Sequence, residues 1–368
     1  MTWIAALTVC VAAAGGADAE LTAPALFPES GAFGVVVHTP FRAGGLKAVG
    51  AQWVRVNVRW GNVEQGARGA YAWDGTDKLL RYYLDEGFRV MAVLTAENLC
   101  PLYEDDKDNK PVVIDAIATW AGAAAARYRG QGILWELGNE PECFPMGGYW
   151  TDPKTYADMA RKAAAAIKAA DPEARVAALS VAWMDRGFIS TCLEEGLLAD
   201  GHIDALSYHG YHRRGMTPES GLADDVGWLR GQIAKYAPAG KSVIVVDSER
   251  GYAMVDFLEP KHWGSWRNLT YSESEQAAYC ARHYLETISL GVEVAVWYKD
   301  MVGEHCYSLY YGTDDDEAGL RPMGHVYRNL AALLPDNPKR LVNCRYTVSL
   351  TDPPDDVSAP DGQLNVRT

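Results

Sequence analysis

Short apolar runs alternate with amphipathic segments along most of the chain. Eight of these runs are nearly continuous and mostly rich in Val and Ile, which is typical of parallel strands buried on both faces. They span residues 33–38, 53–58, 89–94, 133–137, 175–180, 203–208, 242–246 and 293–297. Segments with helical spacing lie between them, most clearly at residues 77–86, 114–129, 155–170, 223–236 and 273–290.

Local signals mark where these helices begin and end. Asp152-Pro153 fits a helix N-cap followed by proline at the first helical position. Glycine takes the left-handed conformation that often ends a helix without a steric clash. Glycines stand just before six of the predicted strands: Gly50, Gly87, Gly130, Gly201, Gly240 and Gly291.

Eight strand-then-helix units within about 300 residues predict a (β/α)₈ TIM barrel. A doubly wound open sheet is the rival, but no Gly-rich phosphate loop follows the first strand. We therefore expect one catalytic domain over residues 20–335 and a C-terminal extension over residues 336–368. The extension contains one strand-like run at 345–350. In such barrels the chemistry lies at the C-terminal ends of the strands.

The first residues fit a signal peptide, although no Lys or Arg precedes the apolar run. An apolar stretch over residues 3–14 is followed by small residues and an Ala-Asp-Ala sequence that ends at Ala19. The run is too short to span a bilayer. We therefore predict a signal peptide at 1–19, no membrane span, and a secreted or periplasmic protein.

The overall charge and the aromatic content limit the class of partner. The net charge of −14 argues against nucleic acid and anionic membranes as partners. Twelve Trp and twenty Tyr stand against seven Phe, and such amphipathic rings suit sugars, although large barrels often contain many aromatics. The oligomeric state is not predicted.

Seven cysteines are present, and six remain after removal of Cys10 with the leader. Neither a CxxC motif nor His/Cys ligand spacing occurs, so we expect no zinc site. We expect no other metal or cofactor. Cys100 and Cys143 fall in the loops after the third and fourth strands, which are neighbours at the barrel mouth. In an oxidising compartment they are the best candidates for a disulfide.

The end of the fourth strand carries the strongest chemical signal, Glu136-Leu137-Gly138-Asn139-Glu140-Pro141. A carboxylic acid here can protonate a leaving oxygen and later deprotonate water. The plain alternative is a glutamate in an exposed loop before proline. An Asn-Glu-Pro at this strand end resembles glycoside hydrolase clan A. The resemblance implies that Asn139 binds the sugar 2-hydroxyl and that Glu140 is the general acid/base.

The seventh strand leads into the second candidate carboxylate, in Val246-Asp247-Ser248-Glu249-Arg250-Gly251. The clan has an apolar strand, then Thr or Ser, then the nucleophilic Glu, so the resemblance makes Glu249 the nucleophile. Asp247 is the runner-up. Alternation along a strand places it on the same side as Glu249 but lower in the barrel, where we expect it to satisfy polar partners beneath the site.

Arg55 on the second strand is the first of several supporting residues. A strand-borne Arg is expensive to bury unless it pairs with carboxylates. In the clan an Arg at this place keeps the nucleophile ionised, and Glu136 is a candidate second partner for Arg55. Taken alone, Arg55 is equally consistent with a buried ion pair that only stabilises the fold.

Other strand ends agree with the resemblance. His209 and Tyr211 after the sixth strand match the clan's sugar-binding His and the Tyr that hydrogen-bonds the nucleophile. Trp297 at the end of the eighth strand matches a Trp that forms the floor of the sugar site. His38, after the first strand, either touches the substrate or packs. A lone strand His or Trp is more often a packing residue, so the joint placement carries the inference.

The resemblance covers essentially the whole barrel. Within the clan, the sequence is most similar to families 39 and 5. Residues 60–74 and 307–327 also resemble these families. It implies retaining hydrolysis of a β-glycosidic bond, xylan-like or β-glucan-like, without a cofactor. The carboxyl separation that distinguishes retention from inversion cannot be measured from sequence.

Three other functions compete with retaining hydrolysis. A transglycosylase would use the same residues, and a carbohydrate-binding barrel would have lost catalysis, although both carboxylates are present. A metal-dependent hydrolase would need paired His ligands on strand ends, and none is present in the sequence. Weaker candidates for sugar contact in post-strand loops are Trp60, Glu97, Tyr149, Trp150, Trp183, Tyr252 and Trp263.

Overall fold

The computed structural model describes residues 9–12, 31–38, 42–96, 99–143, 152–211, 217–254, 270–300, 307–311, 319–334 and 345–348. The chain forms two compact units. Residues 24–338 make up the large unit, and residues 1–23 with 339–368 make up the small one.

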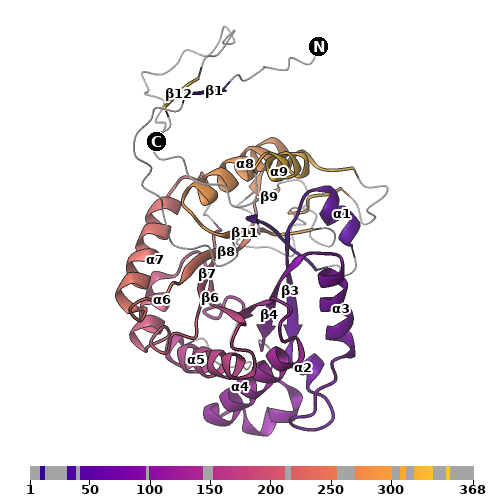
Figure 1. The fold of residues 1–368 in the computed structure, drawn as a ribbon, viewed down its shortest axis with the longest axis vertical. Helices are drawn as coiled ribbons and strands as arrows, with labels where there is room; N and C mark the ends of the chain where they lie inside the picture. The colour runs from indigo at the N-terminus through magenta and orange to yellow at the C-terminus, as the bar shows by residue number, and fades with distance from the viewer. Residues whose placement is uncertain are drawn as a thin grey trace. The chain divides into compact units, whose positions relative to one another are not determined.

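Eight parallel strands close into a barrel in the large unit, with a ring of helices outside it (Figure 1). The predicted (β/α)₈ TIM barrel is therefore confirmed, and each strand begins within two residues of the predicted start. Around the ring the order is β11-β2-β3-β4-β5-β6-β7-β8. Their bounds are β2 Phe33–Val36, β3 Trp53–Arg59, β4 Arg89–Thr95, β5 Leu134–Leu137, β6 Arg175–Ala182, β7 Ala205–His209, β8 Ile244–Arg250 and β11 Val294–Trp297.

The helices cover the outside of the barrel. Those predicted are α3 Asp74–Asp85, α4 Lys110–Arg127, α5 Pro153–Ala170, α7 Leu222–Tyr236 and α8 Glu273–Ser289. The structure adds α1 Ala43–Ala48, α2 Trp60–Val63, the 3₁₀ helix η1 Pro101–Asp106, α6 Arg186–Glu194 and α9 Pro322–Leu333. A short parallel pair, β9 Ala253–Met254 and β10 Thr270–Tyr271, follows β8.

The predicted helix signals are present. The Asp152 side chain accepts a hydrogen bond from the Thr155 amide at 2.8 Å, so Asp152 caps α5. All six glycines predicted to end helices have a positive φ, between 68° and 86°. These residues therefore define where each outer helix ends and the chain turns back into the barrel.

The interior of the barrel changes from apolar to polar along the strands. The lower layer is hydrophobic and includes Trp53, Leu134 and Ala205. Because side chains alternate along a strand, the inward position two residues later is Arg55 on β3 and Glu136 on β5. Both are at most 2% exposed. The polar layer thus lies directly above a packed hydrophobic floor, toward the C-terminal strand ends.

The small unit contains one antiparallel pair, β1 Val9–Ala12 with β12 Arg345–Val348. β12 coincides with the strand-like run predicted in the C-terminal extension. β1 lies within the predicted signal peptide, so cleavage after Ala19 would leave β12 without this partner. The signal peptide itself stays a prediction.

The expected Cys100–Cys143 disulfide is wrong, because the structure holds both as free thiols. Cys100 is buried where η1 begins, and its Sγ lies 3.4 Å from the Glu64 carbonyl oxygen. Cys143 is exposed in the turn after β5. Adjacent loops therefore do not bring the two sulfurs together. Cys306 and Cys344 lie outside the described residues.

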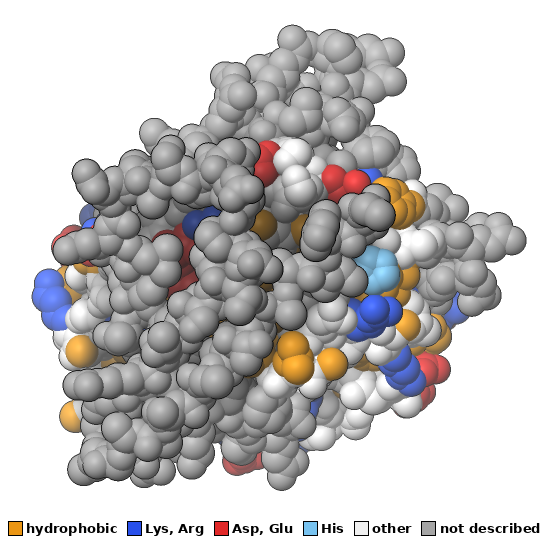
Figure 2. All heavy atoms as spheres, turned by 90° about the horizontal axis from the view of Figure 1, so that it is seen from above, with side chains coloured by type: hydrophobic (Ala, Val, Ile, Leu, Met, Phe, Trp, Pro, Cys, Tyr) orange, Lys and Arg blue, Asp and Glu red, His pale blue; other side chains and the backbone are white. Residues whose placement is uncertain are grey.

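None of the helices in the described ranges combines the length and hydrophobicity needed to cross a membrane. On the face shown in Figure 2, described acidic and basic side chains are interspersed with hydrophobic and neutral ones. The negative net charge therefore does not gather into one patch among the described side chains of that face.

Candidate active site

Arg55 is the centre of a hydrogen-bond network at the C-terminal end of the barrel. Its Nε donates to Glu136 Oε2 at 2.7 Å, and Nη1 donates to Glu249 Oε2 at 2.8 Å. Nη2 donates to Asn139 Oδ1 at 2.9 Å. The guanidinium therefore links three strands, and Glu136 is its second carboxylate partner, as the sequence suggested.

Glu249 is held on both carboxylate oxygens. Arg55 contacts Oε2, and the Tyr211 hydroxyl donates to Oε1 at 2.7 Å. Burial and the charge of Glu249 raise the pKa of Tyr211 well above its usual value, so the phenol stays protonated and keeps donating. These contacts fix the orientation of the Glu249 carboxylate and disperse its charge.

Glu140 lies in a tight turn directly after β5. Its φ is 44°, a left-handed conformation that is rare outside glycine. The turn is fixed to the neighbouring strand, because the Glu140 amide donates to the Ser180 carbonyl at 3.0 Å. Backbone strain of this kind is costly and persists where the surroundings enforce it, commonly at functional sites.

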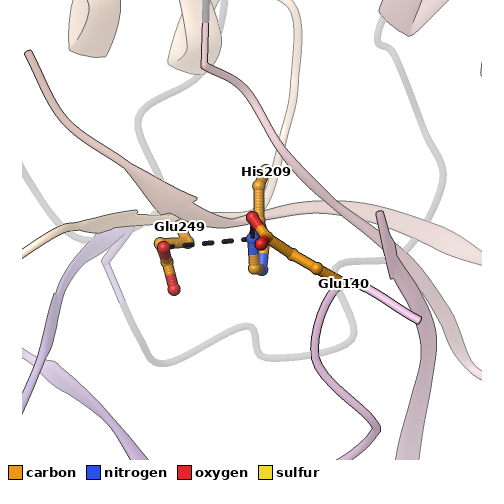
Figure 3. A group of neighbouring side chains, drawn as sticks. All are labelled: Glu140, His209 and Glu249. Atoms are coloured by element: carbon orange, nitrogen blue, oxygen red, sulfur yellow. Dashed lines mark hydrogen bonds and ion pairs between the residues drawn. The ribbon is translucent and has the colours of Figure 1, made fainter. Parts of the chain in front are cut away.

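His209 lies between the two glutamates (Figure 3). Its Nδ1 is 2.9 Å from Glu140 Oε1 and 4.0 Å from Glu249 Oε1. Nε2 lies 3.0 Å from Ser180 Oγ and 3.3 Å from the Arg55 guanidinium. Because Arg55 can only donate, Nε2 accepts in the neutral ring and Nδ1 carries the proton toward Glu140.

The buried charges in this cluster stabilise one another. Burial opposes the charge on Glu136, but the Arg55 guanidinium outweighs it and lowers the pKa of that carboxyl. Burial likewise opposes the charge of Arg55, and Glu136 and Glu249 raise its pKa. For His209, burial is outweighed by Glu249 and Glu140, so its pKa is raised. Removing any one of these charged side chains would therefore leave its partners buried without a compensating charge.

The side chains of Glu140, His209 and Glu249 are close enough to share a cation, since one ligand atom of each lies within 4.8 Å of the others. The atoms that would bind the cation already make hydrogen bonds, however. Glu249 is bound by Arg55 and Tyr211, and the His209 nitrogens contact Glu140 and Ser180. A guanidinium bonded to a carboxylate supplies the charge that a metal ion would supply, so we assign no metal to this cluster.

Asp247 does not lie beneath Glu249 on the same side of β8, and that expectation is wrong. The pairing of β7 with β8 shifts register, so that Tyr208 pairs with Asp247 but His209 pairs with Glu249. This bulge places an extra residue between the two acids and breaks the alternation. Asp247 instead approaches α8, where its Oδ2 lies 3.0 Å from His283 Nε2.

The buried position of His283 predicts a pH-dependent stability. Burial and the positive charge of Arg250 lower the pKa of His283 to about 4. Between the ordinary value near 6.5 and pH 4, the unfolded chain binds a proton that the folded protein does not. Stability from this group is therefore complete above about pH 6.5 and is lost as the pH falls.

We expect the unfolding free energy of the wild type to drop by about 2 kcal/mol more than that of His283→Gln between pH 7 and pH 4.5. Urea denaturation at both pH values measures the difference. Parallel losses in the two proteins would show that His283 does not titrate in this way.

Trp297 is not part of the site, which corrects the sequence assignment. It is fully buried, stacks against Tyr284 of α8, and donates from Nε1 to the Tyr307 carbonyl at 3.0 Å. Val294 and Val296 face the barrel interior, so alternation turns Trp297 outward toward the helices. The next inward residue is Tyr298, which packs against the interior cluster.

The structure does not connect His38 to the two glutamates by any hydrogen bond among the described residues. His38 is exposed after β2, and its ring meets Tyr298 edge to face at 5.2 Å. Tyr298 contacts Tyr307, which in turn contacts Tyr211. These aromatic rings form one side of the site next to Glu249, so His38 stays a candidate for substrate contact.

The weaker candidates divide into three groups. Trp60 and Tyr252 are buried and serve packing. Trp183 is 47% exposed, directly after β6. Its φ is 48°. Its backbone amide donates a hydrogen bond to the His209 carbonyl oxygen, which places Trp183 next to the network. The remaining candidates, Glu97, Tyr149, Trp150 and Trp263, lie outside the described residues.

The sequence analysis did not single out Ser180, Tyr298, Tyr307 or Glu142 as residues of the site or its surroundings. Ser180 gives no signal, because its hydroxyl reaches the site only through the distorted end of β6, where Leu179 and Ser180 have positive φ. Tyr298 could have been found by extending the alternation of Val294 and Val296. Glu142 follows Glu140 by two residues and accepts a hydrogen bond from the Ala182 amide at the end of β6. The burial of its second carboxylate oxygen is not visible in the sequence.

One family model matches the chain over residues 43–213, and its description is Cellulase (glycosyl hydrolase family 5). The matched range includes Arg55, Asn139, Glu140 and His209 and ends before Glu249. A search of the curated proteins found no match.

Solved structures similar in fold come from families 39 and 5. A family 39 glycoside hydrolase from Bacteroides cellulosilyticus WH2 has a TM-score of 0.66 and 18% identity, with 83% of this chain and 64% of that one covered. A GH39 β-xylosidase from Caulobacter crescentus has a TM-score of 0.55, 16% identity and coverage of 88% and 74%. A GH5-4 broad specificity endoglucanase from Clostridium acetobutylicum has a TM-score of 0.57, 14% identity and coverage of 80% and 96%.

These findings define the class of protein. The fold is the barrel of clan A glycoside hydrolases, the clan that contains both families, and the family model indicates a glycoside hydrolase. The chain spans slightly less than two thirds of the first of these structures, so they establish its fold and not its substrate.

Proposed function

We propose that this protein hydrolyses β-glycosidic bonds with retention of configuration, using Glu249 as nucleophile and Glu140 as acid/base. The observation that carries the proposal is the approach of the two carboxylates, with one oxygen of each within 4.8 Å. Retaining glycosidases place these groups about 5–5.5 Å apart, whereas inverting ones need about 6.5–9.5 Å to fit a water molecule.

The first step breaks the glycosidic bond. Glu249 attacks the anomeric carbon and forms a covalent glycosyl ester, while Glu140 gives its proton to the leaving oxygen. Arg55 and Tyr211 hold the Glu249 carboxylate in position before the attack, because each donates a hydrogen bond to one of its two oxygens. When Glu249 becomes an ester, its charge disappears and these donors lose a partner.

The second step releases the sugar. Glu140, now a carboxylate, takes a proton from water, and the resulting hydroxide attacks the anomeric carbon as the ester bond to Glu249 breaks. Asn139 presents its carbonyl oxygen to Arg55 at 2.9 Å. Its amide nitrogen therefore points away as a donor, and we assign it to the sugar 2-hydroxyl.

For the substrate we propose a β-linked poly- or oligosaccharide of the xylan or β-glucan type. The aromatic side of the site, with Tyr298, Tyr307 and Tyr211, suits the apolar face of a pyranose. Neighbours in the fold include a protein named β-xylosidase and another named endoglucanase. A panel of aryl β-xylosides, β-glucosides and the matching oligosaccharides tests the class.

Turnover of at least one β-linked substrate supports the proposal, and turnover of none with sugar binding intact would favour a binding barrel. Chain-lengthened products in the same reactions would show transglycosylation by the same residues. Chromatography of the reaction products separates these outcomes.

Tyr298, rather than Trp297, is expected to contact the sugar. Tyr298→Leu should lower kcat/KM roughly tenfold, because one aromatic contact near the reacting sugar is lost. Trp297→Phe should leave kcat/KM close to the wild-type value and lower the melting temperature instead, since Trp297 is fully buried. The reverse pattern would restore Trp297 as the sugar contact.

We also propose that the protein is exported. The support is the apolar run over residues 3–14 followed by Ala-Asp-Ala at residues 17–19. Expression of the full chain in a bacterial host, followed by sequencing of the secreted or periplasmic product, should give an N-terminus at Glu20. Retention of the intact chain in the cytoplasm would contradict export.

A further inference from the structure

Trp183 is unusually exposed for a tryptophan of this barrel. It is 47% exposed, whereas the other tryptophans that the structure describes are buried or partly buried. A ring of this size normally buries most of its apolar surface. Trp183 directly follows β6, at the end of the barrel where the chemistry lies. The ring therefore serves something other than the packing of the barrel.

The backbone that presents Trp183 is strained and firmly held. Trp183 and Met184 have φ of 48° and 51°, a left-handed conformation that is rare for bulky residues. Met184 is buried. Asp185 then caps α6, where its side chain accepts a hydrogen bond from the Phe188 amide at 2.9 Å. Strain of this kind persists where the surroundings enforce it, commonly at functional sites.

Hydrogen bonds connect this strand end to the surroundings of Glu140. β5 and β6 are paired neighbours in the barrel, and the Glu140 amide donates to the Ser180 carbonyl at 3.0 Å. The Trp183 amide donates to the His209 carbonyl at 3.1 Å. His209 in turn contacts Glu140, with Nδ1 2.9 Å from Oε1. Trp183 is therefore fixed next to the proposed acid/base.

The two carboxylates act on opposite sides of the bond that breaks. Glu249 attacks the anomeric carbon, so the attacked sugar lies toward β8 and its neighbour β11, where Tyr298 and Tyr307 are in contact. Glu140 protonates the leaving oxygen, so the leaving group lies toward β5 and its neighbour β6. Trp183, directly after β6, is on the side of the leaving group.

We propose that Trp183 binds the sugar on the leaving-group side of the scissile bond and makes the enzyme prefer substrates from which a β-linked sugar leaves. The inference rests on the proposed function, since it takes Glu140 as the acid/base. The flat apolar face of the indole suits a pyranose, and its N–H can donate to a hydroxyl. Contacts to a part of the substrate that does not itself react can lower the barrier to reaction.

Trp183→Ala tests this contact on two pairs of substrates. The pairs are xylotetraose with β-xylobiosyl fluoride, and cellotetraose with β-cellobiosyl fluoride. A tetrasaccharide releases a sugar, whereas a fluoride leaving group offers no surface to the ring. We expect kcat/KM to fall roughly tenfold or more for the tetrasaccharide and by less than about twofold for the fluoride. Trp183→Phe keeps an aromatic ring and should recover most of the loss.

Two further variants separate a sugar contact from a general defect. Tyr298→Leu should lower kcat/KM alike for both members of a pair, because Tyr298 lies on the side of the attacked sugar. Leu285→Ala is the matched control, because Leu285 is 49% exposed but lies on the outer helix α8. Its kcat/KM values should equal those of the wild type for both members.

An equal loss with tetrasaccharide and fluoride in Trp183→Ala would mean that the residue acts through the fold or the turn of Glu140. Unchanged values with both would mean that the ring does not contact the leaving sugar. Either result overturns the inference and leaves the proposed function intact.

A wild type that hydrolyses nothing fails the proposed function separately. Calorimetric titration with xylotetraose and cellotetraose then decides, as it does where the wild type hydrolyses only one member of a pair. Weaker binding to Trp183→Ala than to the wild type supports the sugar contact. Equal binding to the two proteins, or no binding to the wild type, overturns it.

Discussion

Glu249→Gly is expected to reduce kcat/KM by roughly 10⁴-fold or more, on the scale seen when an enzyme loses its nucleophile. Without the carboxylate no covalent intermediate forms, and the oxocarbenium-like transition state loses its closest negative charge. Azide added to the variant can occupy the vacated space. We expect it to attack the anomeric carbon directly and to give the glycosyl azide of inverted configuration.

Glu140→Gly provides the complementary result with a 2,4-dinitrophenyl glycoside. Glu249 is intact there, so the glycosyl ester forms and azide attacks it from the opposite face, giving the azide of retained configuration. The activity of this variant should fall by roughly 10²–10⁴-fold on substrates with poor leaving groups. Proton NMR of the azides distinguishes the two anomers. Rescue of both variants to the same anomer would contradict the assignment.

Arg55→Met is expected to have the second largest effect, on stability as well as activity. The guanidinium is 2% exposed and pairs with Glu136, which is fully buried. Removing one partner leaves an uncompensated buried charge, so we expect the free energy of unfolding to fall by about 3–5 kcal/mol. Activity should fall by at least roughly 10²-fold, because Glu249 and Asn139 both lose the donor that orients them.

A second variant separates the two effects of Arg55. In Arg55→Met/Glu136→Leu both buried charges are removed, and replacing an ion pair by apolar residues is often close to neutral. The double variant should therefore recover most of the stability and none of the activity. Urea denaturation and kcat/KM measured on the same preparations test this. If the double variant loses as much unfolding free energy as Arg55→Met and Glu136→Leu lose together, Arg55 and Glu136 are not coupled.

The strands could be predicted because parallel barrel strands are buried on both faces and form uninterrupted apolar runs. β8 is the exception in length. Its predicted end was Val246, but the strand continues through Asp247 and Glu249 to Arg250. Polar residues at the mouth of a barrel look like loop residues in a sequence, although they are still paired in the sheet.

Positions set by period-two alternation or by loop paths were harder to predict. Trp297 matches the residue type expected at its strand end, but it points outward, and the inward position belongs to Tyr298. Asp247 is displaced by a register shift that no residue type signals. The Cys100–Cys143 pairing failed because η1 directs Cys100 toward Glu64. A strand end can be located from sequence, but side-chain direction there depends on bulges and neighbouring strands.

The stereochemistry of hydrolysis tests the central claim most directly. The wild type would act on a β-glycoside from the panel in a proton NMR tube, and the anomeric signals of the first product would be followed before mutarotation. Glu140 and Glu249, with oxygens within 4.8 Å, predict that the β-anomer appears first. Initial appearance of the α-anomer would mean single displacement by water and would contradict Glu249 as the nucleophile.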